Sequence, residues 1–178
     1  PILMTYDGDR MDVEELTVPT DLYWVIVDLC AGKDTREILN RLNHCYPFAD
    51  DDIQRGVQKL LGPINQRIVM QAADALRRGD APEIGRLMTE AQAEFDRYCI
   101  PACPSQLTSP VLHKVLAHPA FKPYIWGGKG VGSQGDGTAQ FIVRDEAAQQ
   151  KVIDLLARDF KMVGLKLVIR SGRRVRKA

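Results

Sequence analysis

The stretch Gly127-Gly128-Lys129-Gly130-Val131-Gly132-Ser133-Gln134-Gly135-Asp136-Gly137 is the most informative part of the chain. It holds six of the fourteen glycines and lies between two apolar, strand-like segments, residues 124–126 and 139–143. Each glycine costs roughly 0.5–1 kcal/mol of folding entropy relative to alanine, so this density indicates positive φ angles or a close approach of the backbone to a partner. Backbone N–H groups in such a loop can hold an anion, and Lys129 adds a positive charge. The stretch is interpreted as a loop that binds phosphate or closes over a substrate, with a glycine hairpin without a ligand as the alternative.

The bulk composition excludes several classes of protein. The chain has 178 residues, 45% of them hydrophobic, and a net charge of +1, which indicates one domain with a real core, or one domain plus part of another. A net charge this close to zero does not indicate electrostatic binding to nucleic acid or to a membrane surface. No apolar run approaches the roughly 20 residues of a transmembrane helix, and no basic segment of a signal peptide opens the chain. We expect a cytoplasmic protein.

The four cysteines do not form a disulfide framework. Cys99 and Cys103 have a C-x₃-C spacing, and His44 stands beside Cys45, but no second closely spaced pair of cysteines completes a zinc site. We therefore expect reduced cysteines and no bound metal held by this chain.

The chain opens with strand-like segments. Residues 1–6 and 13–18 read as strands around an Asp7-Gly8-Asp9 turn, and residues 22–27 form a continuous apolar run that suits a buried strand. A domain that opens directly on strands resembles the last part of a sheet that begins upstream. We therefore assign residues 1–33 to the C-terminal strands of an incomplete N-terminal domain.

The central part of the chain has helical spacing. Asp34 or Thr35 can cap a helix that extends to Cys45, and a long helical segment over residues 50–78 is interrupted at Gly62-Pro63. A further helix begins at Pro82, with Ile84, Leu87, Met88, Ala91 and Phe95 on one face.

The last third of the chain alternates between strands and a helix. A strand near Tyr124, the glycine stretch, a strand over 138–143, a helix over 146–160 and a strand over 165–169 follow in order. With the preceding helix this order is α-β-β-α-β, which suits the split βαβ or ferredoxin-like arrangement. We assign residues 34–172 to this α+β domain and residues 173–178 to a basic tail. The tail is interpreted as a solvated terminus, with contact to nucleic acid as the alternative.

The glycine stretch also contains the G-x-G-x-x-G pattern, from Gly130 to Gly135. A Rossmann dinucleotide site needs a strand before this pattern and a helix after it, whereas here a strand follows. No Walker A motif occurs in the chain. A glycine loop between two strands is suited to lie flat against a ligand that another part of the protein holds.

In this context the chain resembles the kinases of the GHMP superfamily (galactokinase, homoserine kinase, mevalonate kinase and phosphomevalonate kinase). Their third motif is a Gly-Ala-Lys followed by a glycine-rich run and a strand, to which residues 127–137 are similar. The Leu87-Met88 pair and the Ser109-Pro110 break also resemble the family pattern. The resemblance implies the end of a GHMP-kinase N-terminal domain followed by a ferredoxin-like C-terminal domain with extra helices. It also implies ATP-dependent phosphoryl transfer, with Mg²⁺, to a hydroxyl of a small molecule.

The chain departs from the family in two respects. Gln134 and Asp136 stand where the family has small residues, and we expect Asp136 to point outward and cap a turn. The first two family motifs, the second being a phosphate loop, are absent from the chain. The resemblance therefore places the catalytic base upstream of Pro1, and we expect this chain to lack the N-terminal kinase portion and to be inactive by itself.

The two polar loop residues favour a sugar as the phosphoryl acceptor. A mevalonate-type kinase and a non-catalytic, metabolite-binding regulatory module are the alternatives, and a homodimer is left open. We expect no membrane partner and no nucleic acid partner. Lys33 is expected to neutralise a phosphate or carboxylate, and the residues after it to begin a helix that favours an anion. The expected substrate-binding and phosphate-binding residues are Gly127, Gly128, Lys129, Gly130, Gly132, Ser133, Gln134, Gly135, Asp136 and Gly137, together with Lys33, Asp34 and Thr35.

Overall fold

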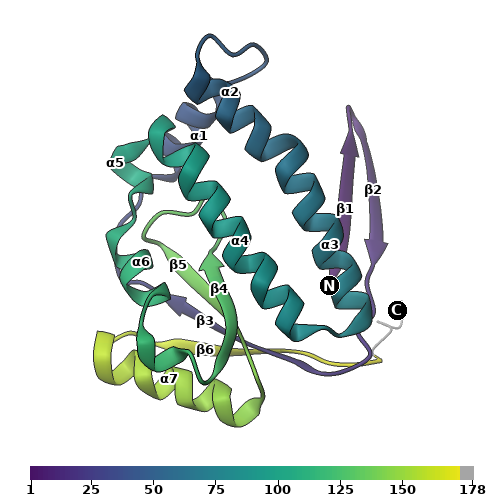
Figure 1. Ribbon diagram of the computed structural model, residues 1–178, viewed down its shortest axis with the longest axis vertical. Helices are drawn as coiled ribbons and strands as arrows, with labels where there is room; N and C mark the ends of the chain where they lie inside the picture. The colour runs from purple at the N-terminus through teal and green to yellow at the C-terminus, as the bar shows by residue number, and fades with distance from the viewer. Residues whose placement is uncertain (173–178) are drawn as a thin grey trace.

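The computed structural model describes residues 1–172 of the chain, so the predicted basic tail over 173–178 lies outside the described residues. The chain begins with a hairpin of two antiparallel strands, β1 (Ile2–Asp7) and β2 (Arg10–Glu15), which form a sheet of their own. Gly8 in the turn has a φ of 59°, a conformation that glycine adopts without strain. The hairpin lies beside the helices, at the right in Figure 1.

A second sheet of four antiparallel strands forms the centre of the fold. Its order is β4-β5-β3-β6, and α7 connects β5 to β6. This is the ferredoxin-like arrangement, so the predicted α+β fold class is confirmed. The strands are β3 (Leu22–Asp28), β4 (Ile125–Gly130), β5 (Thr138–Val143) and β6 (Gly164–Ile169).

Strand β3 belongs to the four-stranded sheet, although the expected domain boundary after residue 33 placed it in the preceding domain. The division placed β3 with the opening hairpin, but β3 pairs with β5 on one side and with β6 on the other. The apolar strand β3 therefore occupies a central position in the four-stranded sheet. The α-β-β-α-β order predicted from the sequence becomes the full β-α-β-β-α-β order of a ferredoxin-like domain when β3 is added at its start.

The first helix, α1, begins at the predicted Asp34 cap but ends at Asn43, two residues before the predicted Cys45. The carboxylates of Asp34, Asp51, Asp80 and Asp145 accept backbone N–H groups at the starts of α1, α2, α4 and α7. Gly79 ends α3 with a φ of 67°. The bounds are α1 (Thr35–Asn43), α2 (Asp52–Lys59), η1 (Leu60–Ile64), α3 (Asn65–Arg78), α4 (Ala81–Cys99), η2 (Ile100–Ala102), α5 (Pro104–Leu107), α6 (Pro110–Leu116), η3 (Pro119–Phe121) and α7 (Glu146–Phe160).

The predicted break at Gly62-Pro63 is confirmed as a π-helical segment, η1, between α2 and α3. Gly62 leaves helical geometry there, because a proline at the next position removes a helical hydrogen bond and restricts the residue before it. The α2–η1–α3 rod lies alongside α4 in Figure 1. None of the helices over residues 1–172 combines the length and apolar character needed to cross a membrane.

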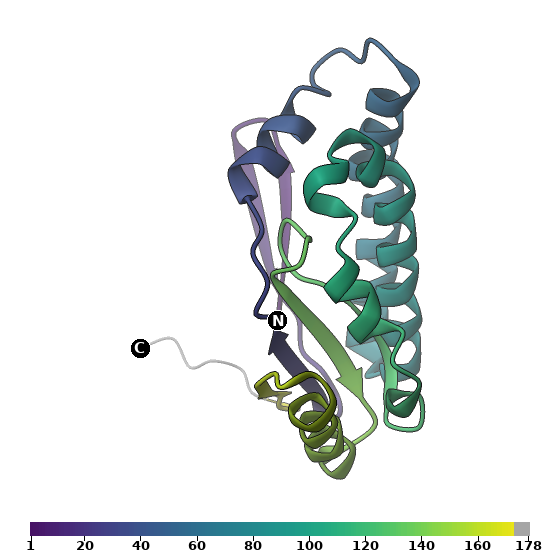
Figure 2. The same cartoon turned by 90° about the vertical axis from the view of Figure 1, so that its left-hand side faces the viewer.

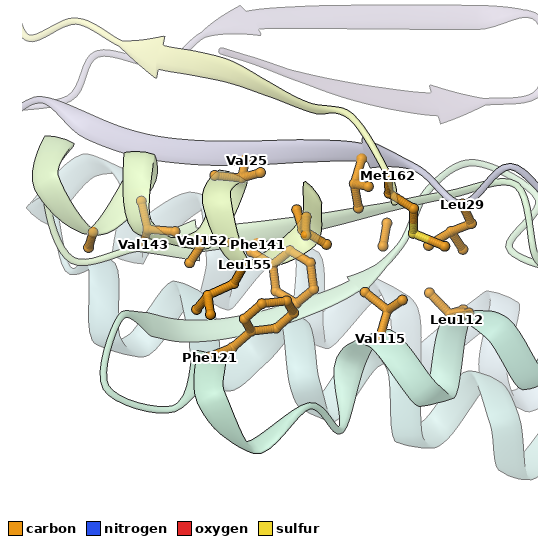
Figure 3. Packing of buried hydrophobic residues seen from close by; sticks show 14 residues of the cluster. Val25, Leu29, Leu112, Val115, Phe121, Phe141, Val143, Val152, Leu155 and Met162 are labelled. Carbon is orange, nitrogen blue, oxygen red and sulfur yellow. The ribbon is translucent and has the colours of Figure 1, made fainter. Parts of the chain in front are cut away.

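Both faces of the four-stranded sheet carry apolar clusters. On one face, residues of β3 and β5 pack against α6, η3 and α7, and the rings of Phe121 and Phe141 meet edge to face with centroids 5.4 Å apart (Figure 3). On the other face, Ile142 packs against Ile84 and Met88 of α4. Figure 2 shows α4 and α7 on different sides of the strands. The loop between β4 and β5 leaves this core at the end of the sheet where α1 begins.

Candidate functional site

The first two glycines of the predicted site allow close packing against β4. Gly127 and Gly128 are buried in β4, where α4 lies against the strand. A Cβ at Gly127 would overlap the carbonyl oxygen of Gly85 on α4, and a Cβ at Gly128 would lie 2.6 Å from Cδ1 of Phe141. Close packing on both sides of β4 therefore accounts for these two glycines, which lie in the strand and outside the loop.

The side chain of Lys129 bonds to the backbone of its own strand, β4. Its Nζ donates a hydrogen bond of 2.7 Å to the carbonyl of Gly130, and burial lowers the pKa of its ammonium group. In the described arrangement this ammonium group is partly buried, whereas we expected a cation that contacts a phosphoryl group.

Residues 131–137 form the loop itself. A hydrogen bond of 3.0 Å from the N–H of Val131 to the carbonyl of Thr138 closes its neck. Gly132, Gln134 and Gly135 have φ angles of 64°, 62° and 73°, so three of the seven loop residues adopt the left-handed region. The backbone N–H groups of five loop residues have no acceptor among residues 1–172; these residues are Gly132, Ser133, Gly135, Asp136 and Gly137.

Lys33 lies under this loop, so the structure brings together two parts of the predicted site. Its Nζ donates a hydrogen bond of 2.8 Å to the carbonyl of Gln134. Its side chain passes so close to the loop that a Cβ at Gly137 would lie 2.7 Å from Cε of Lys33. The ammonium group of Lys33 therefore lies beside Gln134 and Gly137 of the loop.

The start of α1 does not offer the free anion site that we expected. The carboxylate of Asp34 accepts the N–H groups of Arg36 at 2.9 Å and Glu37 at 3.1 Å, so the helix start already holds an anionic group of its own. The neighbouring Thr35 reaches the loop, since its Oγ1 lies 3.5 Å from Oγ of Ser133. Thr35 and Ser133 thus present two hydroxyl groups beside the glycine loop.

Asp136 is half-buried and contacts the start of α6, whereas we expected it to point outward and cap the turn. Its Oδ1 accepts the N–H of Leu112 in the first turn of α6 at 2.8 Å. Gln134 is only 6% exposed, and its Oε1 is buried without a hydrogen-bond partner among the described residues. Asp136 caps α6 and Gln134 is buried, so neither side chain is free to bind a sugar hydroxyl. The two residues therefore do not support a sugar as the acceptor.

Two glutamine side chains that hold the backbone next to the loop and next to α1 were not predicted from the sequence. Oε1 of Gln92 on α4 accepts the N–H of Gly130 at 2.7 Å, and its Nε2 donates to Asp96 at 2.8 Å. On the other side of the loop, Oε1 of Gln106 accepts the N–H of Asp34 at 2.8 Å. Gln92 follows Met88 by four residues, so a polar residue on the apolar face of this helix is the sequence signal that could have found it.

A groove of about 760 Å³ runs along α1 to the start of α2, and Asp34 is the predicted site residue in its lining. Its lining carries both signs of charge, including Arg36, Arg41 and Glu37. The site therefore has a glycine loop with free N–H groups at one end and a polar groove at the other.

Comparison with known proteins was made at the level of sequence and of structure. No sequence-family profile and no curated protein matches the chain. Among solved structures, mevalonate kinase from L. major in complex with R-mevalonate superposes with a TM-score of 0.73 at 16% identity, over 97% of this chain and 50% of that one. Homoserine kinase from Cytophaga hutchinsonii superposes with a TM-score of 0.59 at 20% identity, over 93% and 46% of the two chains.

The fold is that of the GHMP kinases. Phosphomevalonate kinase from Streptococcus pneumoniae, in complex with phosphomevalonate and AMPPNP, shares this GHMP fold with a TM-score of 0.61 at 10% identity, over 89% and 44% of the two chains. The present chain therefore spans about half the length of these GHMP-fold proteins. The helices and the four-stranded sheet correspond to a GHMP-kinase C-terminal domain.

Proposed function

We propose that this chain is the C-terminal part of an ATP-dependent kinase that phosphorylates a hydroxyl group of a small molecule. The observation that carries the proposal is the loop over residues 131–137, whose five N–H groups have no acceptor in the described part of the chain. Successive unpaired backbone N–H groups in a turn can bind anions such as phosphate oxygens. The GHMP fold and an AMPPNP complex among the structural neighbours support a nucleotide as the source of that phosphate.

The arrangement suits phosphoryl transfer, because catalysis of that reaction is mostly positioning and charge stabilisation. When bound, ATP supplies the phosphoryl group that is transferred. The loop N–H groups would hold phosphate oxygens, and the ammonium group of Lys33 would offset their charge from beneath the loop. Ser133 and Thr35 would donate hydroxyl hydrogen bonds at the rim.

The residues present fit a phosphate better than a metal ion. No group of three His, Cys, Asp or Glu side chains in the described residues could hold a cation. The carboxylates of Asp34 and Asp136 are already paired with helix N–H groups. We therefore propose that Mg²⁺ would be held chiefly by the phosphates and by groups outside residues 1–172.

The acceptor is proposed only as a small alcohol. The solved structures that share the fold include complexes with R-mevalonate and with phosphomevalonate, which favours a mevalonate-like acceptor as much as a sugar. The groove that begins at Asp34 is our candidate for the acceptor side, since its mixed charges suit a polar ligand. The catalytic base is proposed to come from the N-terminal half of the fold.

Amide NMR tests the phosphate site directly. The ¹⁵N-labelled chain is titrated with AMPPNP and Mg²⁺, with adenosine as the control that lacks phosphate. We expect shifts of the amides of Gly132, Ser133, Gly135, Asp136 and Gly137 with AMPPNP and none with adenosine. Equal shifts with both ligands, or no shift at all in the loop, would contradict the proposed phosphate site.

A transfer assay tests the reaction. The complete product of the reading frame that encodes this chain is incubated with Mg²⁺ and ATP, and ADP release is followed over a panel of mevalonate, phosphomevalonate, homoserine and hexoses. We expect turnover with one acceptor class. Binding of AMPPNP without turnover on any acceptor would favour the regulatory module instead.

A further inference from the structure

Gly130 is the last residue of β4, and the loop over residues 131–137 departs from it. β4 is an edge strand of the four-stranded sheet, so its outer side has no neighbouring strand among residues 1–172. The N–H of Gly130 donates instead to Oε1 of Gln92 on α4, at 2.7 Å. Gln92 is only 6% exposed, and a hydrogen bond shielded from water in this way is stronger than an exposed one. The amide of Gln92 therefore takes the place of a neighbouring strand at the start of the loop.

The carboxylate of Asp96 determines which way the amide of Gln92 faces. An ionised carboxylate only accepts hydrogen bonds, whereas a backbone N–H such as that of Gly130 only donates. Oδ1 of Asp96 lies 2.8 Å from one end of the amide, so that end is the Nε2 donor and Oε1 is left to face Gly130. Asp96 follows Gln92 by four residues, and one turn of α4 brings the two side chains together. Asp96 thus acts on the backbone of Gly130 through Gln92.

The carboxylate of Asp96 is held in this place at a cost in free energy. Its side chain is 25% exposed, and burial raises the pKa of the carboxyl group, an effect that the hydrogen bond from Gln92 partly offsets. On the α6 side, Nε2 of His113 lies 3.6 Å from Oδ1 of Asp96. Both residues line a groove of about 510 Å³ beside β4. A half-buried carboxyl group with a perturbed pKa in a groove is a candidate for a functional role.

Gly130 is confined from its other side as well. A Cβ at this position would overlap Oε1 of Gln134 and would lie 3.0 Å from Cδ2 of Leu112 on α6. The N–H of Leu112 in turn donates to Oδ1 of Asp136, near the end of the loop. The start of the loop is therefore fixed through α4, and its end through α6.

We propose that Asp96 is a positioning residue for the glycine loop, which acts by holding the amide of Gln92 against Gly130. This inference rests on the proposed function, because it gives the fixed position of the loop a use in binding phosphate. A loop that is already held in place loses less conformational freedom when an anion binds, and it therefore binds that anion more tightly. Loss of either side chain loosens the start of the loop and weakens phosphate binding.

Four variants of the chain separate this role from a general effect on stability. Gln92→Leu removes the acceptor of the Gly130 N–H, whereas Asp96→Leu keeps that acceptor and removes the group that orients it. Asp96→Asn retains an oxygen that can accept from Nε2 of Gln92. Glu94→Leu is the matched control on the same helix, since side chains two residues apart on a helix do not face each other.

Amide hydrogen exchange measures the effect on the loop. We expect Gln92→Leu and Asp96→Leu to speed exchange about fivefold at Gly130 and Val131, the size of effect that loss of one hydrogen bond produces. We expect a smaller effect at Phe141 in the middle of β5, and original rates in Asp96→Asn and Glu94→Leu. Unchanged exchange at Gly130 and Val131 in Asp96→Leu would overturn the proposal. Equal acceleration at Gly130 and Phe141 would also overturn it, in favour of a general loss of stability.

Titration with AMPPNP and Mg²⁺ measures the effect on binding. We expect a several-fold loss of affinity in Gln92→Leu and Asp96→Leu, and the original affinity in Asp96→Asn and Glu94→Leu. If Asp96→Asn binds as weakly as Asp96→Leu, the negative charge of Asp96 acts on the ligand by itself, and the orienting role is wrong.

The two hypotheses fail separately. If AMPPNP shifts the loop amides of the original chain but Asp96→Leu changes neither exchange nor affinity, the positioning role is wrong and the proposed function stands. If Asp96→Leu loosens the start of the loop but AMPPNP shifts no loop amide of the original chain, the positioning role stands and the proposed phosphate site does not.

Discussion

Gly127 of β4 and Gly85 of α4 lie in direct backbone contact, and neither position has room for a side chain. A Cβ at Gly85 would lie against the backbone and Cβ of Trp126, as a Cβ at Gly127 would against Gly85. This contact sets how closely α4 approaches the strand that leads into the glycine loop. The loop therefore begins from a rigid base.

The first prediction concerns this contact. Gly127→Ala is expected to reduce the free energy of unfolding by about 2–3 kcal/mol, because the added methyl group must displace backbone atoms of α4. The matched control is Gly32→Ala, where nothing lies within 4 Å and φ is not positive, with an expected change within about 0.5 kcal/mol. Urea unfolding measures both variants. A Gly127→Ala protein as stable as Gly32→Ala would show that α4 and β4 can separate freely.

The second prediction concerns Lys33. Lys33→Met keeps the length of the side chain but loses the hydrogen bond to the carbonyl of Gln134, so we expect a loss of about 1 kcal/mol and faster amide exchange in the loop. Lys151→Met is the control, since Lys151 is exposed on α7. Thermal unfolding and hydrogen exchange at residues 131–137 are the measurements. Unchanged exchange in the Lys33 variant would mean that this bond does not hold the loop.

The third prediction concerns Asp136. Asp136→Ala leaves the N–H of Leu112 without its acceptor and is expected to cost about 1 kcal/mol, the usual value of a helix cap. Asp136→Asn retains a side-chain oxygen and should cost only a fraction of that amount. Denaturant unfolding of the two variants side by side decides the matter. Equal losses in both would assign the effect to charge and remove the cap from the explanation.

The fourth prediction concerns pH. Burial lowers the pKa of Lys129 below its ordinary value of 10.5, so the unfolded chain binds this proton more tightly than the folded chain does. Stability from this group therefore increases as the pH rises from the lowered value toward 10.5. Lys129→Met removes the ionisable group, so we expect it to be at least as stable as the original chain at pH 7 and to lose that part of the increase.

The measurement is the difference in unfolding free energy between the original chain and Lys129→Met at pH 7 and pH 10. Titrations of the other groups cancel in this difference. A difference that does not change with pH would show that the folded protein does not perturb the ammonium group of Lys129.

Local signals predicted most of the secondary structure. Asp34, Gly79 and the Gly62-Pro63 pair each act through neighbouring backbone atoms, so their effect on helix ends can be read from the sequence. The pairing partners of β3 could not be read in this way, because an apolar run indicates a buried strand without saying which strands flank it.

The candidate site was predicted in part. Lys33 and the loop over 131–137 do lie together, although 101 residues separate Lys33 from Gln134. The roles of Gly127 and Gly128 could not be predicted, because a glycine needed for close packing and a glycine needed for a ligand are the same residue type in a sequence. The role of Gln92 depended on the distance between α4 and β4, which only the folded structure gives.

The central position of β3 also bears on how the protein is synthesised. The ribosome completes β3 at Asp28, but β5 begins only at Thr138, which is 110 residues later (138 − 28). At roughly 5–20 residues per second, the apolar strand waits on the order of 5–20 s for its first partner, while every helix from α1 to α6 has already emerged. During translation, β3 is therefore the segment that most needs a chaperone or the early helices to protect it from aggregation.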